Sequence, residues 1–371
     1  MSIETILQKT GPRKLLALDG GGIRGMLTIE VLARIEKLLA DVKGVPDLVL
    51  ADYFDYIAGT STGAIIATCL ALGMPVAKVR DFYRENGPAM FDRAALLEMY
   101  RYRFRDDKLA DRLKKIFGAD TTLGSDRIRT LLMMVLRNAT TDSPWPLSNN
   151  PRARYSRADH PGCNLKLPLW QLVRASTAAP TFFPPESVRV GTKEFIFVDG
   201  GVTMYNNPSF QLFLMATVEP YNLCWPTGED RMLVVSVGTG TSTAANADLQ
   251  PSDLNLLYNA GSVPSALMTA ALNEQDFLCR VFGKCLAGPQ IDREVGNMIG
   301  QGGPIAPKLF TYVRYNVELD RAGLEALELD YMNPVDLRKL DSIEHTDDLQ
   351  EVGRRVGKTQ VKASHFQNFP P

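Results

Sequence analysis

The chain has 371 residues, of which 45% are hydrophobic and 22% charged, a composition typical of soluble globular proteins with a large buried core. Lys and Arg total 41 against 42 Asp and Glu, so the charge balance argues against a nucleic-acid polymer as the partner. The longest apolar stretch, near residues 64–72, is far shorter than the roughly 18 residues that span a bilayer, so any membrane contact is expected to be peripheral.

The first part of the chain alternates expected strands with expected helices. Residues 13–18 predict a buried strand, and residues 26–40 carry apolar side chains on one helical face. A second strand is expected at residues 54–58, followed by an apolar helix at residues 64–72 that Gly73 ends. This alternation favours a mainly parallel central sheet with helices on both faces, a three-layer α/β/α architecture.

Residues 86–165 mix charged helical stretches with a loop rich in Pro, Asn and Ser, and we interpret them as a cap-like insertion over the sheet edge. The alternating pattern resumes at residue 167. The elements expected there are helices at 169–178, 208–218 and 266–282, strands at 194–198, 231–237 and 309–317, and a polar loop at 241–262. We therefore expect an α/β core over residues 13–240 and a C-terminal extension, residues 241–371, packed on the same domain.

Two glycine-containing motifs follow the first two expected strands. The first is DGGGIRG at residues 19–25, and the second is GTSTG at residues 59–63. A G-x-S-x-G turn between a strand and a helix holds its serine, here Ser61, up and away from the sheet. A glycine run at a helix N-terminus leaves backbone N–H groups unobstructed, where they can bind an oxyanion. Together the motifs predict serine-based acyl chemistry.

A serine hydroxyl needs a base within hydrogen-bond reach. The three histidines, at positions 160, 345 and 365, do not follow expected strands, so surface or packing roles are expected for them. Asp199 is the better candidate because it ends the strand at 194–198 and precedes two glycines. Side chains beyond the carboxyl ends of parallel strands meet at one edge of the sheet, and burial can raise a carboxyl pKa toward neutrality. The alternative is that Asp199 only forms an Asp-Gly turn.

The glycine run has a competing interpretation. Gly20, Gly22 and Gly25 also satisfy G-x-G-x-x-G, the dinucleotide fingerprint of dehydrogenases. That fingerprint expects an acidic residue at the end of the second strand, about 20 residues on, whereas residues 36–41 still belong to the expected helix. The oxyanion interpretation therefore fits better.

In the oxyanion interpretation, Gly21, Gly22 or their neighbours supply the N–H donors. Arg24 adds positive charge or forms a structural ion pair, and Asp19 shapes the turn. Residues 101–105, where arginines alternate with aromatics, have two interpretations. They can bind phosphate groups of a lipid or a nucleotide by ion pairing and stacking, or they form a solvated edge or loop, which is the interpretation we favour.

The sequence indicates neither a metal nor a cofactor. Its five cysteines are scattered, odd in number and without the spacing of zinc ligands. We expect reduced packing thiols, which indicate a cytoplasmic protein.

As an ordered set, the motifs at residues 19–25, 59–63 and 199–201 resemble those of the patatin-like phospholipases, with further matches at 175–180 and 237–240. The resemblance covers about residues 13–240. It implies a patatin-like fold and a metal-independent, cofactor-free hydrolase of phospholipid and related acyl esters, a dyad enzyme in which few histidines are needed. It assigns Ser61 as nucleophile and Asp199 as base. Around them it places the oxyanion residues Gly20, Gly21, Gly22, Arg24 and Gly25 and the elbow glycines Gly59 and Gly63.

Residues 310–316 are similar to a narrower bacterial group, cytoplasmic patatin-like effectors that cyclic oligonucleotides switch on in antiphage signalling and that degrade the host membrane. This similarity implies a cyclic oligonucleotide activator and, in the active state, a homo-oligomer on the phospholipid surface of the inner membrane. The alternative from another class is a nucleotide- or lipid-binding module that kept the fold and lost turnover. The presence of Ser61, Asp199 and all the loop glycines argues against that alternative.

Overall fold

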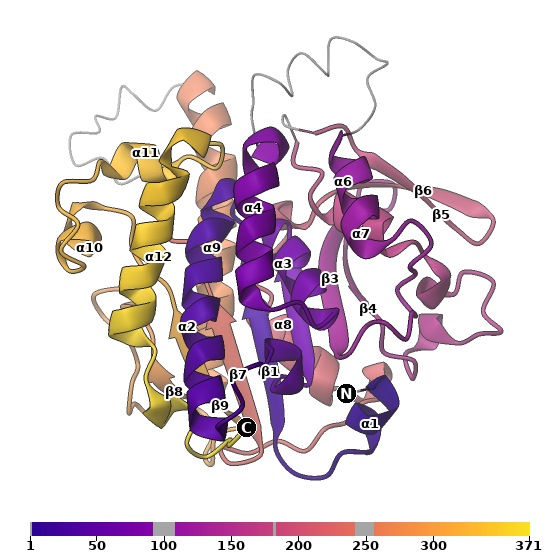
Figure 1. The fold of residues 1–371 in the computed structure, drawn as a ribbon, viewed down its shortest axis with the longest axis horizontal. Helices are drawn as coiled ribbons and strands as arrows, with labels where there is room; N and C mark the ends of the chain where they lie inside the picture. Colours follow the sequence, from indigo (N-terminus) through magenta and orange to yellow (C-terminus); the bar gives the residue numbers. More distant parts are fainter. Residues whose placement is uncertain (1, 92–107, 181–182, 242–255) are drawn as a thin grey trace.

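A computed structural model describes residues 2–91, 108–180, 183–241 and 256–371 (Figure 1). The expected edge at residues 101–105 lies outside the described residues. Within them, the strands form one sheet in the order β5-β6-β3-β2-β1-β7-β9-β8, with β4 paired to β3. The strands are β1 (Arg13–Leu18), β2 (Tyr56–Thr60), β3 (Leu131–Asn138), β4 (Ser143–Ser148), β5 (Glu186–Val190), β6 (Lys193–Asp199), β7 (Met232–Val237), β8 (Gly283–Ala287) and β9 (Phe310–Tyr315).

Helices cover both faces of this sheet (Figure 1). One face packs against α2 (Gly25–Lys43), α3 (Thr62–Ala71), α4 (Val76–Phe91), α6 (Lys108–Phe117), α7 (Leu169–Ser176) and α12 (Thr346–Gln360). The other packs against α1 (Ile3–Gln8), α8 (Ser209–Thr217) and α9 (Leu256–Phe282). Two short helices, α10 (Arg321–Glu325) and α11 (Pro334–Arg338), precede α12. No helix in the described part of the chain has both the length and the apolar character to cross a bilayer.

The burial pattern of β1 explains the three layers. Successive strand side chains point to opposite faces, so Leu16 and Leu18 enter one hydrophobic core while Leu15 and Ala17 enter the other. All six β1 residues are buried, because β1 lies in the middle of the sheet, between β2 and β7, where helices cover both faces. The expected α/β/α architecture with a mainly parallel sheet is confirmed.

Residues 131–148 correct the expected boundary of the insertion. They form β3 and β4, and β3 pairs in parallel with β2 from Leu131 to Val135. Every residue from Leu131 to Leu136 is buried, since alternate side chains of β3 enter the two hydrophobic cores on opposite faces of the sheet. The Pro- and Asn-containing stretch that suggested a loop includes β4, an antiparallel neighbour of β3. This part of the chain therefore belongs to the core sheet and not to a cap.

Two further differences concern the C-terminal third. The polar loop expected at 241–262 is helical from Leu256 onward, where α9 begins; residues 242–255 lie outside the described residues. β9 pairs in parallel with β7, and β8 with β9. The C-terminal third thus continues the same sheet, and α12 packs on α2.

Candidate active site

Ser61 occupies a sharp turn between β2 and α3. Its φ of 54° and ψ of −122° fall where residues other than glycine are uncommon. The flanking glycines allow the turn: a Cβ on Gly59 would lie 2.0 Å from the Gly63 carbonyl oxygen, and one on Gly63 would lie 2.4 Å from the Leu18 carbonyl oxygen. No side chain fits at either position, so the backbone can close tightly and hold the serine above the end of the sheet.

Ser61 and Asp199 are in direct contact. The Ser61 Oγ donates a hydrogen bond of 2.6 Å to Asp199 Oδ2, and the Gly201 N–H donates one of 2.6 Å to Asp199 Oδ1. Asp199 is only 4% exposed. Burial raises the pKa of its carboxyl to about 6, against the opposing effect of these two hydrogen bonds. At neutral pH the carboxyl is mostly ionised, which is the state in which it can accept the serine proton.

The structure brings this pair together by a different route than expected. β6 is antiparallel to β3, so Asp199 does not follow a parallel strand as Ser61 does. β3 extends past the end of β2: Val135 pairs with Thr60, the last β2 residue, and the next residue, Leu136, pairs with Asp199. The end of β6 therefore reaches the level of Ser61 from the side.

Two N–H groups of the glycine loop remain available for a ligand. The N–H of Gly20 donates to the Asn206 carbonyl at 3.1 Å, and that of Ile23 to the Leu340 carbonyl at 3.0 Å. Among the described residues, the N–H groups of Gly21 and Gly22 donate to no acceptor. Gly20, expected among the oxyanion residues, has therefore already used its donor, and Gly21 and Gly22 are the candidate donors.

Close approach explains why the loop is built of glycine. A Cβ on Gly20 would lie 2.2 Å from Asn206 Oδ1 and 3.3 Å from the Cβ of Ser61. A Cβ on Gly21 would lie 2.2 Å from Thr239 Oγ1. Gly25 also has no room for a side chain, since its Cβ would lie 2.6 Å from Thr62 Oγ1, at the start of α3. The glycine loop and the serine turn are thus packed directly on each other.

The two charged residues of the loop have different surroundings. Asp19 forms a buried bidentate ion pair with Arg314 on β9, at 2.8 and 2.5 Å. Arg24 has no ion-pair partner in the described part of the chain, and its Nε is buried without a hydrogen bond. Burial lowers the pKa of Arg24 to about 10, so the side chain stays charged at neutral pH. The expected structural ion pair of Arg24 is therefore absent from the described contacts, while Asp19 is anchored to a distant strand.

Comparison with known proteins assigns the family. A family model described as patatin-like phospholipase matches residues 16–213, just over half of the chain. The chain belongs to the patatin-like phospholipase family.

Proteins similar to this chain occur in plants and bacteria. Patatin-like protein 1 of Oryza sativa subsp. indica is 34% identical over 62% of this chain and 59% of its own length. Patatin-like protein 1 of Arabidopsis thaliana is 27% identical over 94% of this chain and 93% of its own length. The cGAMP-activated phospholipase of Vibrio cholerae serotype O1 is 31% identical over 53% of this chain and 56% of its own length. The chain thus spans less than two thirds of the rice and Vibrio proteins. The structural alignment with VipD from Legionella pneumophila covers 92% of this chain and 67% of the VipD chain. The sequence identity is 15% and the TM-score is 0.36.

Several patatin-like site contacts were not expected from the sequence. Ser176 Oγ accepts a hydrogen bond from the Ser61 N–H at 3.1 Å and donates one to the Val135 carbonyl at 2.6 Å. Thr239 Oγ1 donates to the Gly20 carbonyl at 3.0 Å. Both residues lie in segments that the family motifs pick out, 175–180 and 237–240, which was the available signal. Nothing in the local sequence marked the Asn206 carbonyl.

The histidines have other partners, as expected. His160 Nδ1 accepts from the Gly162 N–H, His345 contacts Asp348, and His365 hydrogen-bonds to the Tyr315 hydroxyl. Among the described residues, no three His, Cys, Asp or Glu side chains are arranged to hold a metal ion.

Proposed function

We propose that this protein is a lipid acyl hydrolase with a Ser61–Asp199 dyad. The observation that carries the proposal is the 2.6 Å hydrogen bond between the hydroxyl of a serine with positive φ and a buried carboxylate. The uncommitted N–H groups of Gly21 and Gly22 supply the third part of such a site. Membership in the patatin-like phospholipase family supports an ester of a phospholipid as the substrate.

In the first step, Ser61 Oγ attacks the ester carbonyl carbon and transfers its proton to Asp199 Oδ2. The carbonyl oxygen becomes an oxyanion, which the Gly21 and Gly22 N–H groups stabilise as hydrogen-bond donors. The C–O bond to the leaving alcohol then breaks, and the alcohol takes the proton from Asp199. The acyl group remains as an ester on Ser61.

In the second step, water replaces the alcohol. Asp199 accepts a proton from the water as the water oxygen attacks the acyl carbon, and the oxyanion forms in the same place. Collapse of this intermediate releases the fatty acid, and the proton on Asp199 returns to Ser61 Oγ. A carboxyl pKa of about 6 suits both transfers, because the group is ionised at neutral pH yet basic enough to hold a proton briefly.

The same proposal includes peripheral contact with a phospholipid membrane. Two apolar side chains that follow Asp199 in the chain, Val202 and Met204, are 38% and 47% exposed. Exposed apolar groups next to a lipid hydrolase site suit insertion among acyl chains. A position on the inner membrane and assembly into homo-oligomers remain predictions from the family resemblance.

Activation by a cyclic oligonucleotide is the finer part of the proposal. The relatives from Vibrio cholerae and Escherichia coli, 31% and 32% identical in the aligned regions, are both named cGAMP-activated phospholipases. Their alignments cover 53% of this chain. We infer that this chain responds to a ligand of the same chemical class.

Phospholipid vesicles, incubated with and without cyclic di- and trinucleotides, provide the test. We expect fatty-acid release by the wild-type chain and none by Ser61→Ala or Asp199→Ala, with unchanged circular dichroism. A fluorophosphonate should label the wild type and not Ser61→Ala. Ser187→Ala, which removes an exposed hydroxyl on β5, is the matched control and should retain full activity. Full activity in folded Ser61→Ala would refute the mechanism, and an identical rate with every nucleotide would refute the activation.

A further inference from the structure

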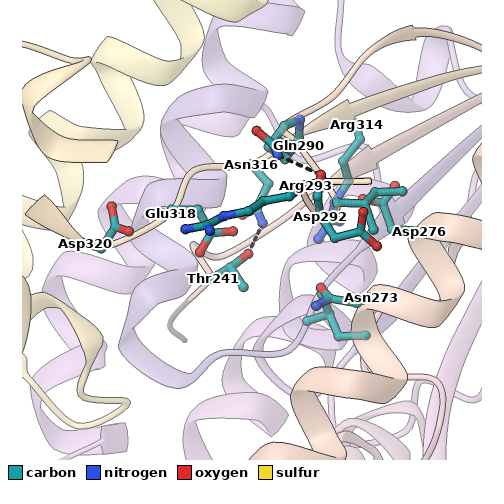
Figure 2. Close-up of a pocket in the computed structure, with 13 residues that line it drawn as sticks. Thr241, Asn273, Asp276, Gln290, Asp292, Arg293, Arg314, Asn316, Glu318 and Asp320 are labelled. Carbon is teal, nitrogen blue, oxygen red and sulfur yellow. Dashed lines mark hydrogen bonds between the residues drawn. The ribbon is translucent and has the colours of Figure 1, made fainter. Parts of the chain in front are cut away.

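A hollow apart from the Ser61–Asp199 pair lies two strands away from Ser61. It has a volume of about 280 Å³ and opens at the ends of β7 and β9, beside α9. Figure 2 shows Asn273 and Asp276 projecting from α9 on one side and Glu318 and Thr241 on the other. Small-molecule sites usually measure roughly 300–1,000 Å³, so this pocket accommodates a fragment such as one heterocyclic ring system.

The lining is rich in hydrogen-bond acceptors. Glu318 is half-buried, and its pKa is raised by burial and by the nearby Asp320. The carboxylates of Asp276, Asp292 and Asp320 already accept hydrogen bonds from protein groups. Glu318 is contacted by Thr241 but has no backbone N–H donor among the described residues, so it is the lining carboxylate best placed to accept from a ligand. A ligand N–H group directed at Glu318 would offset its repulsion by Asp320.

Other side chains favour a planar neutral ring over a simple cation. Arg293 lines the pocket and extends across it toward Glu318 (Figure 2). A guanidinium repels a polyamine but stacks on an aromatic ring. The amide of Asn273 also lines the pocket, and such an amide can pair with a donor–acceptor edge of a nucleobase. The Gln290 amide lines the pocket too, but it already donates to the Asp292 carbonyl at 2.7 Å.

Two residues connect this pocket to the glycine loop. Arg314 lines the pocket and holds Asp19, the first residue of the loop, in the bidentate pair. Asn316 also lines it, and its Oδ1 accepts from the Gly240 N–H at 3.0 Å. The residue before Gly240 is Thr239, which donates to the Gly20 carbonyl. A shift of either strand-end residue therefore reaches the loop that carries the Gly21 and Gly22 donors.

We propose that this pocket binds the base of a purine nucleotide, with Glu318 accepting its N–H groups, and that binding adjusts the glycine loop through Arg314 and Asn316. The ring fills the pocket, while the sugar and phosphates remain at its mouth near the exposed Arg293. This inference rests on the nucleotide activation proposed above and assigns it a site.

Binding is measured by calorimetry on the full chain carrying Ser61→Ala, so that the result does not depend on hydrolysis. The probes are cyclic GMP–AMP, cyclic di-AMP, GMP, AMP and, as a cation without a ring, spermidine. We expect at least one purine nucleotide to bind, and Glu318→Gln to weaken its Kd at least tenfold, because the amide keeps one acceptor oxygen where the charged carboxylate has two. Glu219→Gln makes the same charge change at an exposed residue outside the pocket lining and should leave Kd within twofold.

Coupling to the loop is measured in the chain with Ser61 intact as the rate of fluorophosphonate labelling. The bound nucleotide should raise that rate at least threefold. Glu318→Gln should lose this stimulation at the same nucleotide concentration, whereas the control Glu219→Gln should keep both the basal rate and the stimulation. No purine binding at millimolar concentration, tighter binding of spermidine, or an unchanged Kd in Glu318→Gln would overturn the site. Binding that leaves labelling unchanged would overturn the coupling. Failure of the lipase proposal alone would appear as nucleotide binding without fatty-acid release from any lipid.

Discussion

Replacing Asp199 by Asn keeps the shape of the side chain and removes its charge. Burial raises the folded-state pKa from 3.8 to about 6, so ionisation of Asp199 destabilises the fold. Two pKa units correspond to about 3 kcal/mol at 1.36 kcal/mol per unit. This cost is absent below the unfolded pKa, grows as the pH rises, and is complete above about pH 6. Asn can still accept the Gly201 hydrogen bond through its oxygen.

Asp199→Asn should therefore be inactive and more stable than the wild type. We expect its free energy of unfolding to exceed that of the wild type by about 3 kcal/mol at pH 8 but by only about 1 kcal/mol at pH 4.5, and to match it near pH 3. Urea unfolding, followed by circular dichroism at each pH, measures both differences, and the subtraction removes the effects of all other titrating groups. If the stability difference does not change between pH 4.5 and pH 8, the pKa of the Asp199 carboxyl is not raised. The general-base argument would then fail as well.

Further tests concern the pH profile, the glycine loop, its anchor and metals. The kcat/KM for a soluble ester should rise through about pH 6 and level off above it, because only ionised Asp199 accepts the proton; a flat profile from pH 5 to 8 would contradict this. In Gly21→Ala the new Cβ would meet Thr239, so kcat should fall by a factor on the order of 10² with unchanged circular dichroism. A variant with the kcat of the wild type would show that the Gly21 N–H does not stabilise the oxyanion. Asp19→Ala leaves the Arg314 charge buried and should lower the free energy of unfolding by about 3–5 kcal/mol; urea unfolding with a loss under 1 kcal/mol would speak against the anchor. EDTA should leave the initial rate unchanged, since the proposed steps use only protein groups, and inhibition reversed by added metal would disprove that.

The parts predicted correctly from the sequence depend on local signals. Strands β1 and β2 and helix α3 follow from apolar runs and from glycines that end or begin them, and the turn at Ser61 needs only the residues on either side. β3 shows where local signals fail. Its apolar residues were visible, but their membership in the central sheet depends on pairing with β2, some 75 residues earlier in the chain, and the polar segments around them suggested a cap.

The hydrogen bonding of the glycine loop could not be predicted in the same way. Gly20 and Gly21 look equivalent in the motif, and only the position of the Asn206 carbonyl decides that one N–H is occupied and the other free. The ion pair between Asp19 and Arg314 joins residues 295 positions apart. Residue types make such a pair plausible, but no spacing along the chain indicates it.

The acid of the dyad belongs to a hairpin at the margin of the sheet (Figure 1), and β6 is joined to β3 over only three residue pairs. Ser61, by contrast, follows β2, a strand in the middle of the sheet. The two catalytic side chains are therefore held unequally. Loss of the few backbone hydrogen bonds between β6 and β3 would separate Asp199 from Ser61 while both hydrophobic cores stay intact. Catalysis should therefore be lost on heating before the protein melts.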